Sequence, residues 1–291
     1  MPATTPLYHE IIAHIRTHTR SAGVPGASVR RLALLVTGLI AARSCVLAQI
    51  AAELDALQLT AAVEVASITR RLRRTLADPH LTAARCYDQL LPTVIDWTAA
   101  GQTDGQVVLI VDESTKADQV HLFRVSLAYR GASLPLVWTL WRQNVAQEAG
   151  AYWQQIDAVL ARVAALLPPG LAVTVVADRA YECPRFIDCI AAYGWHWLVR
   201  VKINSDLRFR NQRGVQVRLG TVIRQRVAQP GQRWKARGAV FKKAGWRAAS
   251  VVALWASPAT EPIGGAERPA AALGSAPALR SAFLGRAGFP Q

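Results

Sequence analysis

Two apolar segments, VVLIVD at residues 107–112 and VTVVAD at residues 173–178, decide the fold of this chain. Continuous apolar runs of this length are typical of strands that are buried on both faces of a sheet. The pattern around them predicts further strands over 121–128, 135–141 and 197–203, and helices over 152–167 and 186–193. Strands that alternate with helices in this way predict an α/β fold.

Each of the two buried strands is expected to end in an aspartate, the first in Asp112 and the second in Asp178. In an open α/β sheet, ligands bind beyond the carboxyl ends of the strands. If the two strands are neighbours, the carboxylates lie close together and need a counter-charge, which Mg²⁺ supplies. A pair of such ions activates an attacking oxygen and stabilises a leaving oxygen in phosphoryl transfer. In the alternative interpretation, each aspartate only caps a helix or a turn.

The composition of the chain changes along its length and divides it into four regions. Residues 1–98 have helical periodicity, and residues 99–203 form the α/β region. Residues 204–256 are short alternating stretches separated by Gly and Pro, which predicts a β-rich extension. In residues 263–291, 16 of 29 are Ala, Gly or Pro, so we expect a degenerate, disordered tail over 257–291.

Positive charge is concentrated in one part of the chain. Of the 15 excess positive charges, 13 lie in residues 199–248, which contain 14 Lys and Arg and a single acid. Such a field attracts polyanions, and nucleic acid is the first candidate. The alternative is a solvated basic face that keeps the protein soluble, although surfaces of that kind usually mix both signs.

The helical region carries a second cluster of cations. Its periodicity predicts helices over 9–18, 32–54 and 63–76, and the last of these ends in Arg70, Arg71, Arg73 and Arg74. These arginines cover most of a turn, so at least two face solvent and can contact phosphates, as the second helix of a helix-turn-helix does. Equally, they complement the dipole at a solvated helix end.

Several classes of protein do not fit this sequence. The longest apolar stretch, residues 32–42, is shorter than the ~20 residues that span a membrane, and no secretory signal begins the chain. Four scattered cysteines do not make a disulfide framework. No Gly-x4-Gly-Lys phosphate loop indicates a nucleotide cofactor. We therefore expect a cytoplasmic protein that uses neither a membrane nor a nucleotide cofactor.

Short motifs surround both aspartates. Those near the second are Asp178-Arg179-Ala180-Tyr181, Phe186, Gly194-Trp195 and Arg200-Val201-Lys202, and those after the first are Arg130-Gly131, Pro135-Leu136 and Trp138. As a set, over roughly residues 30–262, these motifs resemble the sequences of IS4-type (IS4 family) DDE transposases, the enzymes that move insertion sequences.

The resemblance implies a ribonuclease H-like catalytic core with an N-terminal helical DNA-binding domain and a β-rich basic insertion. Three acidic residues of such a core hold two Mg²⁺ ions, for which Mn²⁺ substitutes, and Asp112 and Asp178 would be two of these catalytic ligands. The implied reaction is cleavage and strand transfer of DNA phosphodiesters at transposon ends. The implied partners are double-stranded DNA of the terminal repeats, target DNA and a second copy of the chain, as a homodimer on nucleoid DNA.

The resemblance also implies which residues contact DNA besides the arginine cluster at 70–74. They lie beside the second aspartate and in the basic insertion: Arg179, Arg200, Lys202, Arg208, Arg210, Arg213, Arg218, Arg224, Arg226, Arg233, Lys235 and Arg237. Trp234 lies between two of these cations and would stack on an unpaired base. Its alternative role is ordinary packing against the sheet.

One departure from the family pattern concerns the third acid, which belongs to Tyr-x2-Arg-x3-Glu-x6-Lys on a helix after the insertion. No such pattern follows here: Glu182 precedes the insertion, and Glu261 and Glu267 have no helical context. Glu113 would point to the face of the strand opposite to Asp112. We therefore expect a truncated or frameshifted transposase with impaired cleavage. The alternative is a non-catalytic DNA-binding relic, or an inhibitor of the full-length enzyme.

Overall fold

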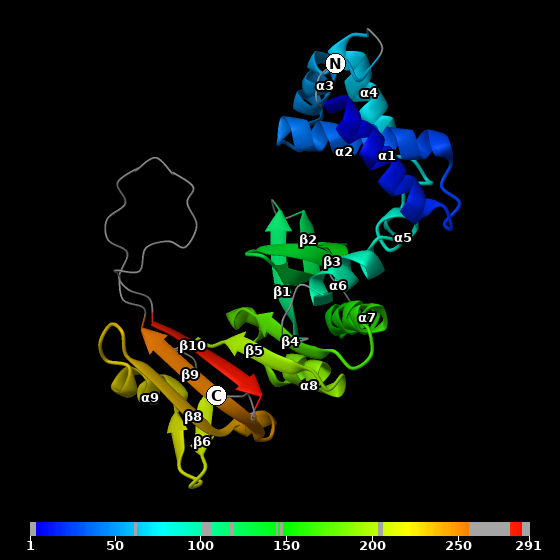
Figure 1. The fold of residues 1–291 in the computed structure, drawn as a ribbon. Coiled ribbons are helices and arrows are strands. Elements are labelled where there is room, and N and C mark those ends of the chain that lie inside the picture. The colour runs from blue at the N-terminus through cyan, green and yellow to red at the C-terminus, as the bar shows by residue number, and fades with distance from the viewer. Residues whose placement is uncertain are drawn as a thin grey trace. The chain divides into compact units, whose positions relative to one another are not determined.

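The computed structural model describes residues 4–60, 63–100, 106–116, 119–143, 145, 148–202, 206–255 and 280–286 (Figure 1). The chain divides into two compact units, residues 1–97 and residues 98–291, and each is described by itself. Helices make up the described part of the first unit, whereas the second contains a large sheet with its own helices. The fold is therefore mixed α/β, as the sequence predicted.

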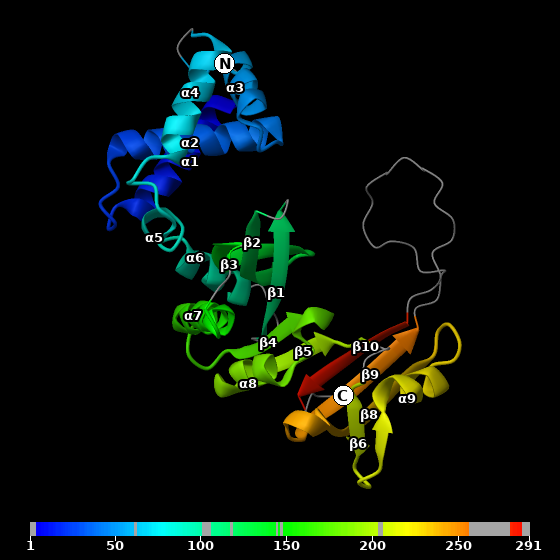
Figure 2. The ribbon, with the colours of Figure 1, turned by 180° about the vertical axis from the view of Figure 1, so that it is seen from behind.

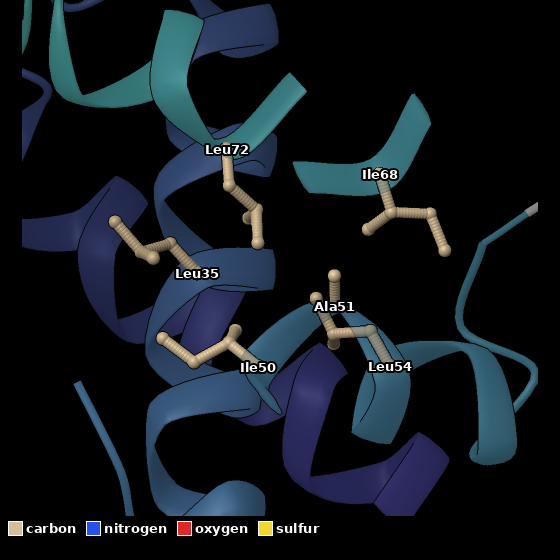
Figure 3. Packing of buried hydrophobic residues seen from close by; sticks show 6 residues of the cluster. All are labelled: Leu35, Ile50, Ala51, Leu54, Ile68 and Leu72. Atoms are coloured by element: carbon tan, nitrogen blue, oxygen red, sulfur yellow. The ribbon is translucent and has the colours of Figure 1, made fainter. Parts of the chain in front are cut away.

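The first unit is a helical assembly around a small apolar core. Its helices are α1 (Thr4–Thr19), α2 (Gly26–Ala42), α3 (Leu47–Ala56), α4 (Val65–Leu76), α5 (Ala83–Cys86) and α6 (Leu91–Ala100), the last of which runs past the boundary between the units. Leu35 of α2 packs with Ile50, Ala51 and Leu54 of α3 and with Ile68 and Leu72 of α4 (Figure 3). Ile68 and Leu72 share one face because they are four residues apart.

The helix expected over 32–54 is wrong as a single element, because the structure divides it into α2 and α3 with a bend of 93°. Arg43 ends α2 in the left-handed region with φ 47°, and the Ser44 hydroxyl then accepts a hydrogen bond from the backbone N of Val46. A Cβ atom at Gly38 would lie 2.6 Å from Cγ2 of Ile50, so this glycine permits α3 to pack closely on α2. Among the described residues, no single helix is both long enough and apolar enough to cross a membrane.

Asp78, just beyond the end of α4, ties this helix to α2. Its carboxylate accepts hydrogen bonds from the backbone N of His80 (2.9 Å) and the Ser28 hydroxyl (2.8 Å), and it pairs with Arg31. The His80 N–H, followed by Arg31 and Ser28, lowers the pKa of Asp78 to about 2. Because the pKa of Asp78 is lower in the folded protein than in the unfolded chain, its ionised carboxylate stabilises the fold. This stabilisation is complete above pH 3.8, the pKa of the unfolded chain, and is lost as the pH falls toward 2.

We therefore expect Asp78→Asn to flatten the pH dependence of stability in the first unit between pH 4 and pH 2. Hydrogen exchange of α2 and α4 amides, measured by mass spectrometry across this range, reports the change. Asp55→Asn, on the exposed side of α3, is the matched control and should keep the wild-type pH profile. An unchanged profile in Asp78→Asn would contradict the role of this carboxylate.

The second unit is built on one ten-stranded sheet (Figure 2). Its strands follow the order β3-β2-β1-β4-β5-β10-β9-β8-β6-β7. Their bounds are β1 (Gln106–Lys116), β2 (Val120–Tyr129), β3 (Ala132–Arg142), β4 (Ala172–Ala177), β5 (His196–Arg200), β6 (Arg208–Asn211), β7 (Gln216–Arg218), β8 (Arg233–Val240), β9 (Arg247–Trp255) and β10 (Arg280–Arg286). Strands β1 to β3 form an antiparallel meander, and β4 and β5 run parallel to β1.

Two helices cover one face of the first five strands. Helix α7 (Ala151–Leu166) connects β3 to β4, and α8 (Pro184–Ala192) connects β4 to β5 after the 3₁₀ turn η1 (Arg179–Tyr181). The ring centroid of Tyr181 lies 6.3 Å from that of Phe123 in β2 and 4.6 Å from that of Phe186 in α8. All three side chains are buried, so this face forms the core of the second unit.

Strands β6 to β9 lie in the β-rich extension expected over 204–256. Strands β6, β7, β8 and β9 are antiparallel to their neighbours, and α9 (Leu219–Arg226) packs against β7 and β8. A second 3₁₀ turn, η2 (Lys242–Ala244), separates β8 from β9. Arg247 at the start of β9 makes a two-pronged ion pair with Asp188 of α8, at 2.7 and 2.6 Å.

The expectation of a disordered tail is wrong for residues 280–286, which form β10 between β5 and β9. The ladder is antiparallel on both sides, so β10 satisfies the backbone groups of two strands that would otherwise be sheet edges. The rest of the expected tail, including Glu261 and Glu267, lies outside the described residues.

Candidate functional site

The sheet brings the two predicted aspartates to neighbouring strands. Val111 of β1 pairs with Ala177 of β4 in parallel register, so Asp112 and Asp178 follow at the same level of the sheet. Neighbouring strands lie about 4.8 Å apart. The expectation that both strands end at the aspartate is wrong for β1, which continues to Lys116 because the antiparallel partner β2 supplies hydrogen bonds over this stretch.

The two carboxylates have different local partners. Asp112 Oδ2 accepts a hydrogen bond from Nη2 of Arg124, which lies opposite it on β2, at 3.0 Å. Asp178 Oδ1 accepts one from the backbone N of Ala180 at 2.8 Å, so it also caps η1, as the alternative interpretation expected. The sequence did not indicate Arg124, because only the register of the β1–β2 hairpin pairs position 124 with position 112.

The donor set fits a divalent cation held by two carboxylates. Among the described residues, the hydrogen bonds of these side chains engage Oδ2 of Asp112 and Oδ1 of Asp178, which leaves the second oxygen of each for a cation. The side chain of Asp112 is 40% exposed, so water and substrate can reach it. Mg²⁺ is commonly bound by one or two carboxylates, with water and phosphate oxygens completing its shell.

A third metal ligand is absent from the part of the chain that the structure describes. There, no group of three or more His, Cys, Asp or Glu side chains is arranged to hold a metal ion. Glu182 accepts a hydrogen bond from the backbone N of Lys202 at 2.6 Å. The family that the sequence resembles uses three acids in a two-ion site, whereas the described residues bring two aspartates, Asp112 and Asp178, to one level of the sheet.

Glu113 faces away from Asp112, as predicted, and belongs to a separate polar cluster. Its carboxylate accepts a hydrogen bond from the Tyr152 hydroxyl at 2.6 Å and lies 3.2 Å from Nε2 of His121. Burial, together with the Glu113 charge, raises the pKa of both Tyr152 and Tyr181 well above the ordinary value, so both hydroxyls remain protonated. The His121 ring stacks on Trp141 at 4.3 Å. This cluster fastens β1 and β2 to α7.

The cations of β8 lie on one face of the sheet. Arg233, Lys235 and Arg237 are exposed, whereas the intervening Trp234 and Ala236 are half-buried. Trp234 therefore lies on the opposite face from Arg233 and Lys235, where its ring is 6.2 Å from that of Phe209. The expectation that Trp234 stacks on a base beside these two cations does not fit this placement, because successive side chains of a strand alternate between faces. Its packing role is favoured.

The other predicted cations of the extension are dispersed over several elements. Arg208 and Arg210 lie on β6, Arg213 follows that strand in the turn to β7, and Arg224 and Arg226 lie on α9. Arg218 pairs with Asp206, and the Arg210 guanidinium lies 4.7 Å above the Trp246 ring. Arg179 in η1, Arg200 at the end of β5 and Lys202 just beyond it lie closest in sequence to the end of the parallel strands.

The arginine cluster of α4 belongs to the first unit. Arg70, Arg71, Arg73 and Arg74 are all exposed, and the opposite side of the helix buries Ile68, Leu72 and Thr75. The connection from α3 to α4 runs from residue 57 to residue 64, which is longer than the 3–4-residue turn typical of a helix-turn-helix. The cluster is accessible to a polyanion, and α4 departs from that motif.

The chain matches no protein-family model, and a search of curated proteins returned no match. The features that bear on function are therefore Asp112 within β1, Asp178 just after β4, and the concentration of positive charge in residues 199–248.

Proposed function

We propose that the chain is a DDE-type DNA transposase in which metal-dependent cleavage and strand transfer at transposon ends are impaired. The observation that carries this proposal is the parallel pairing of β1 with β4, which puts Asp112 and Asp178 side by side. Two carboxylates at this position of an α/β sheet are suited to hold Mg²⁺ against a phosphodiester.

The arrangement of the first five strands supports a ribonuclease H-like core. The order β3-β2-β1-β4-β5, with only β2 antiparallel to the others, is the order expected of that fold. The basic extension follows β5, where the resemblance puts the DNA-gripping insertion. Its charge supports DNA as the partner, because 13 of the 15 excess positive charges lie in residues 199–248.

Each side chain of the site has a definable task in this function. Magnesium, when bound, would polarise the phosphodiester and lower the pKa of an attacking water. Asp112 and Asp178 would hold the ion, and the η1 backbone fixes the second carboxylate through the N–H of Ala180. Arg124 balances the charge of Asp112 at 3.0 Å and is near enough to contact a phosphate that approaches this carboxylate.

A second function, DNA binding without cleavage, is favoured because the described residues include no third acid beside Asp112 and Asp178. With two carboxylates, a second ion is poorly held, and its loss removes stabilisation of either the attacking or the leaving oxygen. A chain of this kind still occupies DNA through its basic surfaces. It would then act as a relic, or as an inhibitor of a complete transposase.

The test compares wild type with Asp112→Ala in duplex binding and in nicking with Mg²⁺ or Mn²⁺. We expect both proteins to bind duplex DNA, and only wild type to give slow metal-dependent nicking. Binding without nicking by wild type would favour the non-catalytic function. Fast cleavage would contradict the loss of the third acid, and failure of wild type to bind DNA would overturn both functions.

A further inference from the structure

The acidic pair belongs to a longer row of side chains that crosses the sheet. Ala177 of β4 pairs with Val199 of β5, so the residues that follow them, Asp178 and Arg200, continue the level of Asp112. Residues at one level of neighbouring strands have side chains on the same face. We call this face, defined by Asp112 and Arg200, the open face, because α7 and α8 cover the other one.

Strand β10 extends the open face into the basic extension. Position 283 of its backbone pairs with Arg200 on one side and with Val252 of β9 on the other, and Val252 pairs with Lys235 of β8. The row that begins at Asp112 therefore ends at Lys235. The exposed Arg233 and Arg237 flank Lys235 on the same face, two residues away along the strand.

The cations of α9 lie on the other side of the extension. Ala249, Val251 and Ala253 of β9 have no exposed surface, and their side chains point away from the open face. Helix α9 packs against β7 and β8 and buries Leu219 and Ile223. A helix packed on β8 covers the face that lacks the exposed cations. Arg224 and Arg226 are therefore separated from the open face by the sheet.

The dimensions of the row suit the backbone of duplex DNA. Five strand intervals separate β1 from β8 in the order β1-β4-β5-β10-β9-β8, which gives about 24 Å. Duplex DNA rises about 3.4 Å per base pair, so this length corresponds to about 7 base pairs.

We propose that the open face is the DNA track of this protein: Arg233, Lys235 and Arg237 contact phosphates of the same duplex whose phosphodiester lies at Asp112 and Asp178, and α9 makes no contact. This inference rests on the proposed function. Within that function, it separates the cations of β8, which contact DNA, from those of α9, which do not. The sequences of β5, β10, β9 and β8, which carry the row from Arg200 to Lys235, contain no acidic residue.

The experiment compares two double variants that remove equal charge from opposite sides of the extension. Arg233→Ala/Arg237→Ala changes the open face, and Arg224→Ala/Arg226→Ala changes α9. Binding of a fluorescent 30-base-pair duplex is measured by anisotropy at several salt concentrations, with circular dichroism to verify folding. Each lost phosphate contact lowers the slope of log K against log[salt] by about 0.9. We expect the magnitude of this slope to fall by about 2 in Arg233→Ala/Arg237→Ala and to change little in Arg224→Ala/Arg226→Ala.

The outcomes separate this inference from the proposed function. The open face is not the DNA track if the slope falls equally in both variants. The same conclusion holds if the slope falls in neither variant while wild type binds DNA with a steep salt dependence. If the slope falls only in the α9 variant, DNA lies on the face that α9 covers and the proposal is overturned. A wild type without salt-dependent binding would instead remove the proposed function itself.

Discussion

A single methyl group at position 238 is expected to separate β6 from β8. In Gly238→Ala, the new Cβ atom would overlap the carbonyl oxygen of Arg210 and lie 2.6 Å from Cε2 of Phe209. The carbonyl belongs to the backbone of the paired strand, so it cannot move without breaking the β6–β8 ladder. Overpacking of this kind costs about 3 kcal/mol. We expect a lower unfolding temperature and a loss of hydrogen-exchange protection in β6 and β8.

The matched control is the same substitution at Gly26, the first residue of α2. There the new Cβ atom would lie 4.0 Å from the end of the Arg30 side chain and would meet nothing closer. Alanine favours a helix more than glycine does, so Gly26→Ala should leave stability unchanged or slightly raised. Wild-type protection of β6 in Gly238→Ala would show that the two strands are not packed as described.

The sequence predicts the fold where the apolar pattern of one segment is enough to identify a buried strand. The apolar runs at 107–111 and 173–177 are present within β1 and β4, because a short run rich in valine fits a strand that is buried on both faces of a sheet. The break at Arg43 was not predictable in this way, since the apolar periodicity resumes after Arg43 and Ser44 and the positive φ falls on an arginine. Strand β10 was missed because its pairing depends on β5 and β9, which are distant in the chain.

The sequence predicts that the two aspartates of the candidate site lie close together, but it does not predict which cations lie beside them. The level of Asp112 and Asp178 follows from the parallel pairing of their strands, which the strand–helix–strand order indicates. The partnership of Asp112 with Arg124 requires the register of a hairpin, which the sequence alone does not fix. For Trp234, the period-two alternation along β8 was the available signal, and it separates this ring from the neighbouring cations.

The second large effect is expected from breaking β10, which joins the first five strands to the extension. In the double variant Ala282→Pro/Leu284→Pro, two backbone N–H donors disappear from β10, where both positions pair with β9 and position 284 also pairs with β5. Each lost hydrogen bond costs about 1 kcal/mol. Together they are expected to raise local opening of β9 roughly 30-fold. Hydrogen exchange should report this in β9 and β5, with β1 and β2 unchanged.

A chain that ends at Arg286 is the control for the β10 variant, because it keeps the whole strand and should behave as the full-length chain does. The pair between Arg247 and Asp188 also holds the extension, so adding Arg247→Gln to the proline variant should increase the opening of β9 further. If β10 is what makes the open face continuous, the proline variant should also lose duplex affinity while keeping all its cations. Wild-type exchange in β9 and wild-type DNA affinity in that variant would show that β10 does not couple the two parts of the sheet.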